Sequence, residues 1–115
     1  MRYMALIYDI EQDTPKPGTP EGTKMDEAYG RFMGELQTLG ISLNGERLQP
    51  IASATSVRVR NGKTVVTDGP FAETREQLGG FFILDCKDLD QALALAAKLP
   101  AAERGAIEIR PVWEM

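Results

Sequence analysis

The residues best suited to chemistry gather around the segment Asp68-Gly69-Pro70-Phe71. Asp68 is a candidate general acid or base, and Glu73 supplies a second carboxylate shortly after it. Arg75 adds a guanidinium group, which can grip a carboxylate or phosphate through two parallel hydrogen bonds. We therefore expect Asp68, Phe71, Glu73 and Arg75 to border a site for a small polar or anionic ligand.

Three more arginines and a tyrosine are candidates for the same cleft. Arg58 and Arg60 alternate with valines along one predicted strand, Arg110 projects from the last strand, and Tyr8 ends the first. If these strands meet, their side chains line the cleft together with Asp68. The alternative is a solvated sheet face or a set of cross-strand ion pairs.

The segment around Asp68 is also a strong turn signal. An aspartate bonds its own backbone two residues on, glycine accepts a positive φ, and proline fixes φ near −65°. Asp68 is therefore either a catalytic or ligand-binding carboxylate, or only the residue that caps a strand-ending turn at Gly69-Pro70.

The chain contains no histidine and a single cysteine, Cys86. This excludes Ser-His-Asp and Cys-His catalysis, imidazole ligands and an internal disulfide. Asp9, Glu11 and Asp13 alternate, but they lack the spacing of a calcium loop. We expect no metal and no cofactor, and we expect Cys86 to be a buried, inert thiol.

The composition limits the classes of partner that the chain can bind. A net charge of −4 without a basic block argues against nucleic acid. The sequence shows no membrane-spanning stretch and no signal peptide, so we expect no membrane association and a cytoplasmic location. At 115 residues the chain is expected to form one domain, residues 1–115.

Apolar periodicity places these candidates on two helices and a set of strands. A 4-3-4-3 spacing predicts a helix over 21–39, and Asp88 is the expected N-cap of a second helix that ends before Pro100. Strands are expected over 2–8, 41–49, 55–60, 63–67, 77–86 and 106–113. Asn61-Gly62 is a strong hairpin signal between 55–60 and 63–67.

Without this hairpin the element order is β-α-β-β-α-β, the ferredoxin-like arrangement of the α+β class. Its two helices cover only one face of the sheet. The strand over 77–86 nevertheless is apolar on both sides, with Phe82 and Leu84 on one and Phe81 and Ile83 on the other. A second copy of the chain is the simplest cover, so we expect a homodimer.

The residues on these elements resemble the DGPF-domain proteins, small bacterial proteins related to the YCII (YciI-like) family. The matching stretches are Arg2 to Tyr8, Val57-Arg58-Val59-Arg60, Asp68 to Phe82, and Glu108-Ile109-Arg110-Pro111-Val112. The resemblance covers nearly the whole chain and implies a dimeric α+β barrel built from ferredoxin-like halves.

The resemblance implies little about function. The role of most members is unknown, and some relatives are fused to, or encoded beside, extracytoplasmic-function sigma factors, which implies regulation. YCII relatives are suspected enzymes because a histidine and an aspartate meet in their cleft. Asp68 matches the aspartate of the DGPF motif, but the histidine has no counterpart here.

We therefore expect a small-molecule-binding or regulatory module. One alternative is an enzyme that uses Asp68 or Glu73 as a general base on a small acidic metabolite, with an arginine steadying the negative charge. The other is a structural subunit without a small-molecule site.

Overall fold

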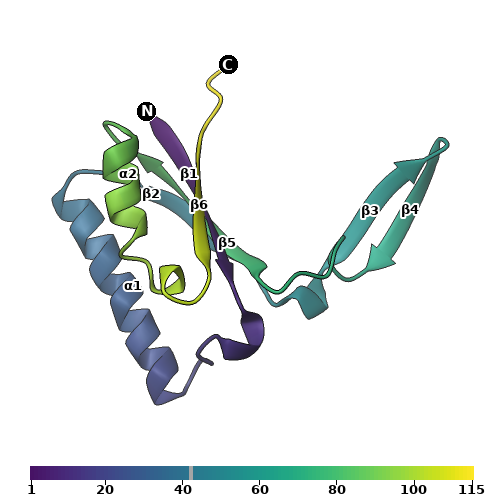
Figure 1. Ribbon diagram of the computed structural model, residues 1–115, viewed down its shortest axis with the longest axis horizontal. Helices are drawn as coiled ribbons and strands as arrows, with labels where there is room; N and C mark the ends of the chain where they lie inside the picture. Colours follow the sequence, from purple (N-terminus) through teal and green to yellow (C-terminus); the bar gives the residue numbers. More distant parts are fainter. Residues whose placement is uncertain (42) are drawn as a thin grey trace.

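The computed structural model, which describes residues 1–41 and 43–115, consists of a sheet with two helices on one face and a projecting hairpin (Figure 1). The sheet is antiparallel, with the strand order β2 (Leu43–Arg47), β5 (Gln77–Asp85), β1 (Arg2–Asp9) and β6 (Ala106–Pro111). The helices are α1 (Pro20–Thr38) and α2 (Leu89–Ala96). The predicted ferredoxin-like α+β fold is confirmed.

Polar caps fix where both helices begin. The Thr19 hydroxyl accepts the Gly22 N–H at 3.1 Å, and the predicted cap Asp88 accepts the Gln91 N–H at 2.9 Å. Gly40 follows α1 with a φ of 69°, the left-handed conformation that glycine adopts without strain.

The core lies between the helices and one face of the sheet. Phe82 of β5 is 8% exposed, and its ring centroid lies 5.5 Å from that of Phe32 in α1. Gly45 of β2 makes room for this ring, because a Cβ there would lie 2.5 Å from Phe82 Cδ1. Helix α2 buries Leu95 and leaves Leu93 48% exposed.

The other face of the sheet carries no helix among the described residues. Its centre is formed by half-buried apolar side chains in register across β1 and β5, where Leu6 pairs with Phe81 and Met4 pairs with Ile83. We call these four residues the open face. The predicted two-sided apolar character of β5 is thus present, but none of the residues that the structure describes covers one of the two sides.

The hairpin is a separate two-stranded sheet, β3 (Thr55–Arg60) and β4 (Lys63–Asp68), which stands away from the helices (Figure 1). Its turn is the predicted Asn61-Gly62, with φ values of 51° and 75°. The radius of gyration is 16.1 Å, against about 13 Å for a compact domain of this length. The hairpin therefore extends the molecule instead of joining the core.

Most element boundaries agree with the sequence prediction to within two residues. The strand expected over 41–49 is shorter, spanning Leu43–Arg47, and residue 42 of that prediction lies outside the described residues. Short 3-10 turns η1 (Glu11–Asp13), η2 (Ile51–Ser53) and η3 (Pro100–Ala102) connect the elements. Among the described residues, no helix has the length and apolar character needed to cross a membrane.

Candidate functional site

The hairpin register separates Asp68 from the arginines expected beside it. Thr55 pairs with Asp68 and Val57 with Val66, so Asp68 shares a face with these valines. Arg58 and Arg60 lie on the opposite face because side chains alternate along a strand. The expected convergence of Asp68 with Arg58 and Arg60 in one cleft does not occur within a single chain.

Asp68 is neither buried nor used by its own turn. The turn is held by the Ser56 hydroxyl, which donates to the Gly69 carbonyl at 2.8 Å, and by the Gly69 N–H, which donates to Ala54 O at 2.7 Å. Gly69 has a φ of 96°, as the turn signal predicted. Asp68 is exposed, and none of the hydrogen bonds among the described residues involves its carboxylate.

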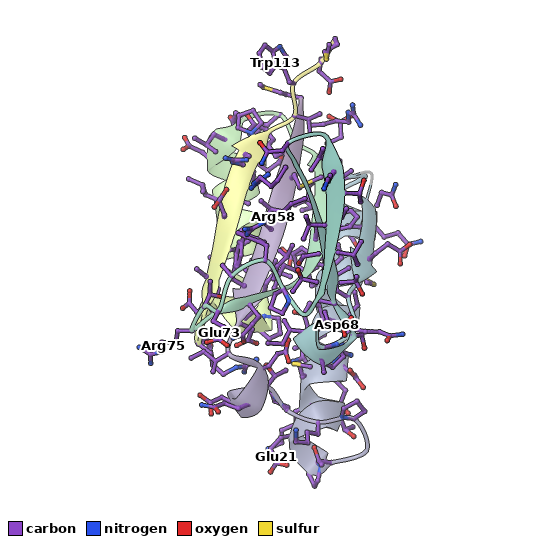
Figure 2. All side chains as sticks on the ribbon, turned by 90° about the vertical axis from the view of Figure 1, so that its right-hand side faces the viewer. Glu21, Arg58, Asp68, Glu73, Arg75 and Trp113 are labelled. Carbon is purple, nitrogen blue, oxygen red and sulfur yellow. The ribbon has the colours of Figure 1, made fainter. Side chains whose placement is uncertain are left out.

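In the loop after the hairpin, the Arg58 side chain contacts Phe71 only at the Phe71 backbone carbonyl. The Arg58 guanidinium donates to the Phe71 carbonyl at 3.2 Å, while the Phe71 ring is 78% exposed. Glu73 and Arg75 are also exposed, and Figure 2 shows them side by side on the loop, across from Asp68. These residues form a rim at the base of the hairpin rather than an enclosed cleft.

Tyr8 and Arg110 lie on the uncovered side of the sheet. Arg110 pairs with Met4 in the β1–β6 register, and Tyr8, four residues after Met4, pairs with Ala106. Arg110 Nε lies 2.8 Å from Glu108 Oε2, and both side chains are largely exposed. This exposed ion pair lies within β6 and is not the cross-strand pair of the alternative, and Arg110 still borders the open face.

A polar cluster that the sequence did not reveal lies where β1 ends and β6 begins. Asp9 and Arg104 form a two-pronged ion pair, with Nη2 to Oδ2 at 2.7 Å and Nε to Oδ1 at 3.2 Å. Their side chains are 13% and 29% exposed, the least of any ion pair among the described residues. The hydrogen bond to Asp9 holds the pKa of Arg104 above its ordinary value.

Tyr29 of α1 completes the cluster. Its ring centroid lies 6.4 Å from that of Phe82, so the core fixes its position. Burial raises the pKa of the Tyr29 hydroxyl, the Asp9 carboxylate raises it further, and Arg47 and Arg104 oppose both effects. None of the hydrogen bonds among the described residues involves this hydroxyl, and Arg47 of β2 is exposed beside it.

The DGPF-type segment anchors the loops around this cluster. Gln77 donates to Thr74 O at 2.6 Å and accepts the Glu11 N–H at 3.0 Å. Glu11 in turn accepts the Ile51 N–H at 2.8 Å, which joins the η1 and η2 turns. Thr74 and Gln77 therefore organise this end of the sheet.

The cluster was hidden in the sequence because Asp9 and Arg104 are 95 residues apart. One signal was available: Asp9 directly follows a predicted strand in a long polar loop, where binding residues concentrate. Among the described residues, no three Asp, Glu or Cys side chains lie close enough to hold a metal ion.

Cys86 lies in the core, 2% exposed, as expected for a structural thiol. Burial raises the pKa of its thiol, and the nearby Asp85 raises it further. A nucleophilic role would need the opposite shift, because the thiolate is the reactive form.

Comparison with known proteins agrees with the fold. The model of the YCII-related domain matches residues 1–115 of the chain. An uncharacterized protein of Rhizobium meliloti (strain 1021), R00369, is 48% identical over 118 residues, which cover 97% of this chain and 92% of that protein. The resemblance drawn from the sequence motifs is confirmed. The name of this relative states no activity, so the functional argument rests on the geometry.

Proposed function

Because the chain belongs to the YCII-related family and yet contains no histidine, we propose that it is a homodimeric module that binds a small polar or anionic molecule. The observation that carries this proposal is the cluster formed by half-buried Asp9, Tyr29 and Arg104 with exposed Arg47 beside them. Binding sites concentrate at titratable clusters that lie at the end of a sheet and beside connecting loops.

The chemistry of the cluster favours an anion. Asp9 accepts two hydrogen bonds from one edge of the Arg104 guanidinium, from Nε and Nη2, which holds that guanidinium in place. The Arg47 guanidinium and the Tyr29 hydroxyl stay available to a ligand. With one carboxylate and two guanidiniums the cluster carries a net positive charge, which suits a carboxylate or phosphate group.

The homodimer is part of the same proposal. It is supported by the open face, whose apolar centre of Met4, Leu6, Phe81 and Ile83 is only half-buried in one chain. Exposed contiguous apolar surface of this kind marks an interaction site. The bound ligand would serve regulation in connection with an extracytoplasmic-function sigma factor. The family resemblance alone supports this role.

The enzymatic alternative based on Asp68 has less support from the geometry. Asp68 is exposed, and the register turns it away from Arg58 and Arg60, so no neighbour would hold a substrate against it in one chain. Its neighbours Glu73 and Arg75 are exposed as well. The binding module is therefore the function that we carry forward.

A thermal-shift screen of small carboxylates and phosphates tests the proposal. The wild type should be stabilised by at least one compound, and Tyr29→Phe and Arg47→Gln should lose that shift while keeping the melting temperature of the free protein. Neither change removes a bond seen within the chain, so both variants should fold. Asp68→Asn is the matched control and should respond as the wild type does.

A shift that survives in Tyr29→Phe and Arg47→Gln but disappears in Asp68→Asn would move the site to the hairpin base and contradict the proposed location. Consumption of the bound compound over time, measured by chromatography, would instead support an enzyme.

A further inference from the structure

The β3–β4 hairpin exposes an apolar surface that no other part of residues 1–41 and 43–115 covers. Val57, Val59 and Val66 share one face of it and are 66%, 61% and 64% exposed. An isolated two-stranded hairpin is marginally stable in water, and exposed β-branched side chains add to its need for a partner. The hairpin is thus built for a contact outside its own chain.

The charge of the hairpin points to the identity of that partner. Residues 55–68 carry a net charge of +2, because they contain three basic side chains (Arg58, Arg60 and Lys63) and one carboxylate (Asp68). Since the whole chain carries −4, the rest of the molecule carries −6. A basic hairpin is therefore electrostatically complementary to the acidic body of another copy of this chain.

The same chain also offers an apolar surface for the valines. The open face presents Met4, Leu6, Phe81 and Ile83 in two paired rows across the central strands. It is flanked by Glu46 on β2 and by the Glu108–Arg110 ion pair on β6. Glu46 pairs in register with Phe81, and Glu108 with Leu6. In one chain the hairpin stands away from this face (Figure 1).

We propose that the hairpin is an arm that docks on the open face of a second copy, with the Val57, Val59 and Val66 face inward. This inference rests on the homodimer of the proposed function and adds the element that holds it. Two-fold symmetry places both arms in equivalent contacts. The arginines, on the outer face of the arm, add long-range attraction to the acidic partner.

The arm is tested with the double variant Val57→Ser/Val66→Ser, which changes two exposed cross-strand neighbours. The dimer dissociation constant, from sedimentation velocity at nanomolar to high micromolar loading, should rise at least about tenfold. Met33→Ser/Leu93→Ser is the matched control, because it removes exposed apolar side chains from the two helices on the other side of the sheet. The control should dimerise as the wild type does.

If the wild type dimerises and Val57→Ser/Val66→Ser dimerises with the same dissociation constant, the docking of the arm is wrong and the homodimer stands. A wild type that stays monomeric throughout would overturn both, whereas ligand binding at Tyr29 is decided separately by the thermal-shift screen. Binding to phosphatidylserine vesicles or duplex DNA that this variant abolishes, with dimerisation unaffected, would replace the second copy by that partner.

The electrostatic part has its own test. Arg58→Glu/Arg60→Glu should weaken the dimer about tenfold at low salt, with the difference fading near 1 M salt as the charges are screened. Lys16→Glu/Lys24→Glu makes the same change in net charge on exposed body positions and should leave the dimer nearly as tight as before. Equal weakening by both pairs would show that only total charge matters and would contradict a specific basic arm.

Discussion

At the residue scale, the polar cluster at the end of the sheet combines one locked guanidinium with two available groups. Asp9 orients Arg104 through two hydrogen bonds, while the side chains of Tyr29 and Arg47 make no hydrogen bond to the described residues. The Tyr29 ring is fixed by Phe82, so its hydroxyl is held in place without being consumed. This is the arrangement expected of a preorganised binding site.

The titration of Tyr29 gives a prediction about alkaline stability. Because folding raises the pKa of Tyr29, mainly through burial, the unfolded chain loses this proton first as the pH rises. The stability contributed by the neutral hydroxyl is complete below the ordinary value near 10 and is lost as the pH rises toward the folded value. Urea unfolding between pH 8 and 11 should show a steeper loss for the wild type than for Tyr29→Phe. Equal slopes would contradict a raised pKa.

The Asp9–Arg104 pair should contribute measurably to folding. Arg104→Gln leaves a largely buried Asp9 carboxylate without its partner, which should cost about 1–3 kcal/mol in the free energy of unfolding. Arg110→Gln breaks the exposed pair with Glu108 and should cost only about 0–1 kcal/mol. Chemical denaturation of both variants checks this, and similar losses would mean that burial does not distinguish the two pairs.

At the element scale, local sequence signals predicted the strands and helices well. The Asn61-Gly62 turn predicted β3 over its observed residues, Thr55–Arg60, and Asp88 marked the start of α2. The same two-residue turn also determines which residues pair, so a register counted from it separates Asp68 from Arg58, although the two were expected to share a cleft. The Asp9–Arg104 contact could not be predicted from the sequence, because it depends on how segments 95 residues apart pack.

Phe82 tests the central position of β5. Its ring contacts Phe32 and Tyr29 across the sheet–helix layer, and Gly45 leaves no side chain that could fill the space. Phe82→Ala should therefore lower the free energy of unfolding by about 3–5 kcal/mol. Guanidinium denaturation measures this, with Phe71→Ala, at a 78% exposed position, as the near-neutral comparison. A near-neutral Phe82→Ala would refute the assigned core.

Gly69 tests the turn between the hairpin and the loop. Its φ of 96° strains any residue with a Cβ, although a Cβ there would meet nothing within 4 Å, so the cost is conformational. Gly69→Val should destabilise by roughly 1–3 kcal/mol. Gly34→Ala, in the middle of α1 with equally open surroundings, should stabilise by about 0.5–1 kcal/mol. A neutral Gly69→Val in thermal melts would show that the turn does not need this conformation.

At the scale of the whole molecule, one chain has the dimensions 50 × 42 × 18 Å and leaves two apolar surfaces uncovered. The open face lies on the sheet side away from the helices, and the hairpin valines lie beyond the compact part. The two-copy assembly that we propose would cover both surfaces, the open face of each copy and the hairpin valines of the other.

The mass of the protein in solution tests this account most directly. Sedimentation equilibrium of the wild type at micromolar concentration should give a particle of about 25 kDa, twice the 12.7 kDa of the chain. A single species of 12.7 kDa under the same conditions would contradict the assembly on which the covered sheet face and the docked arm both depend.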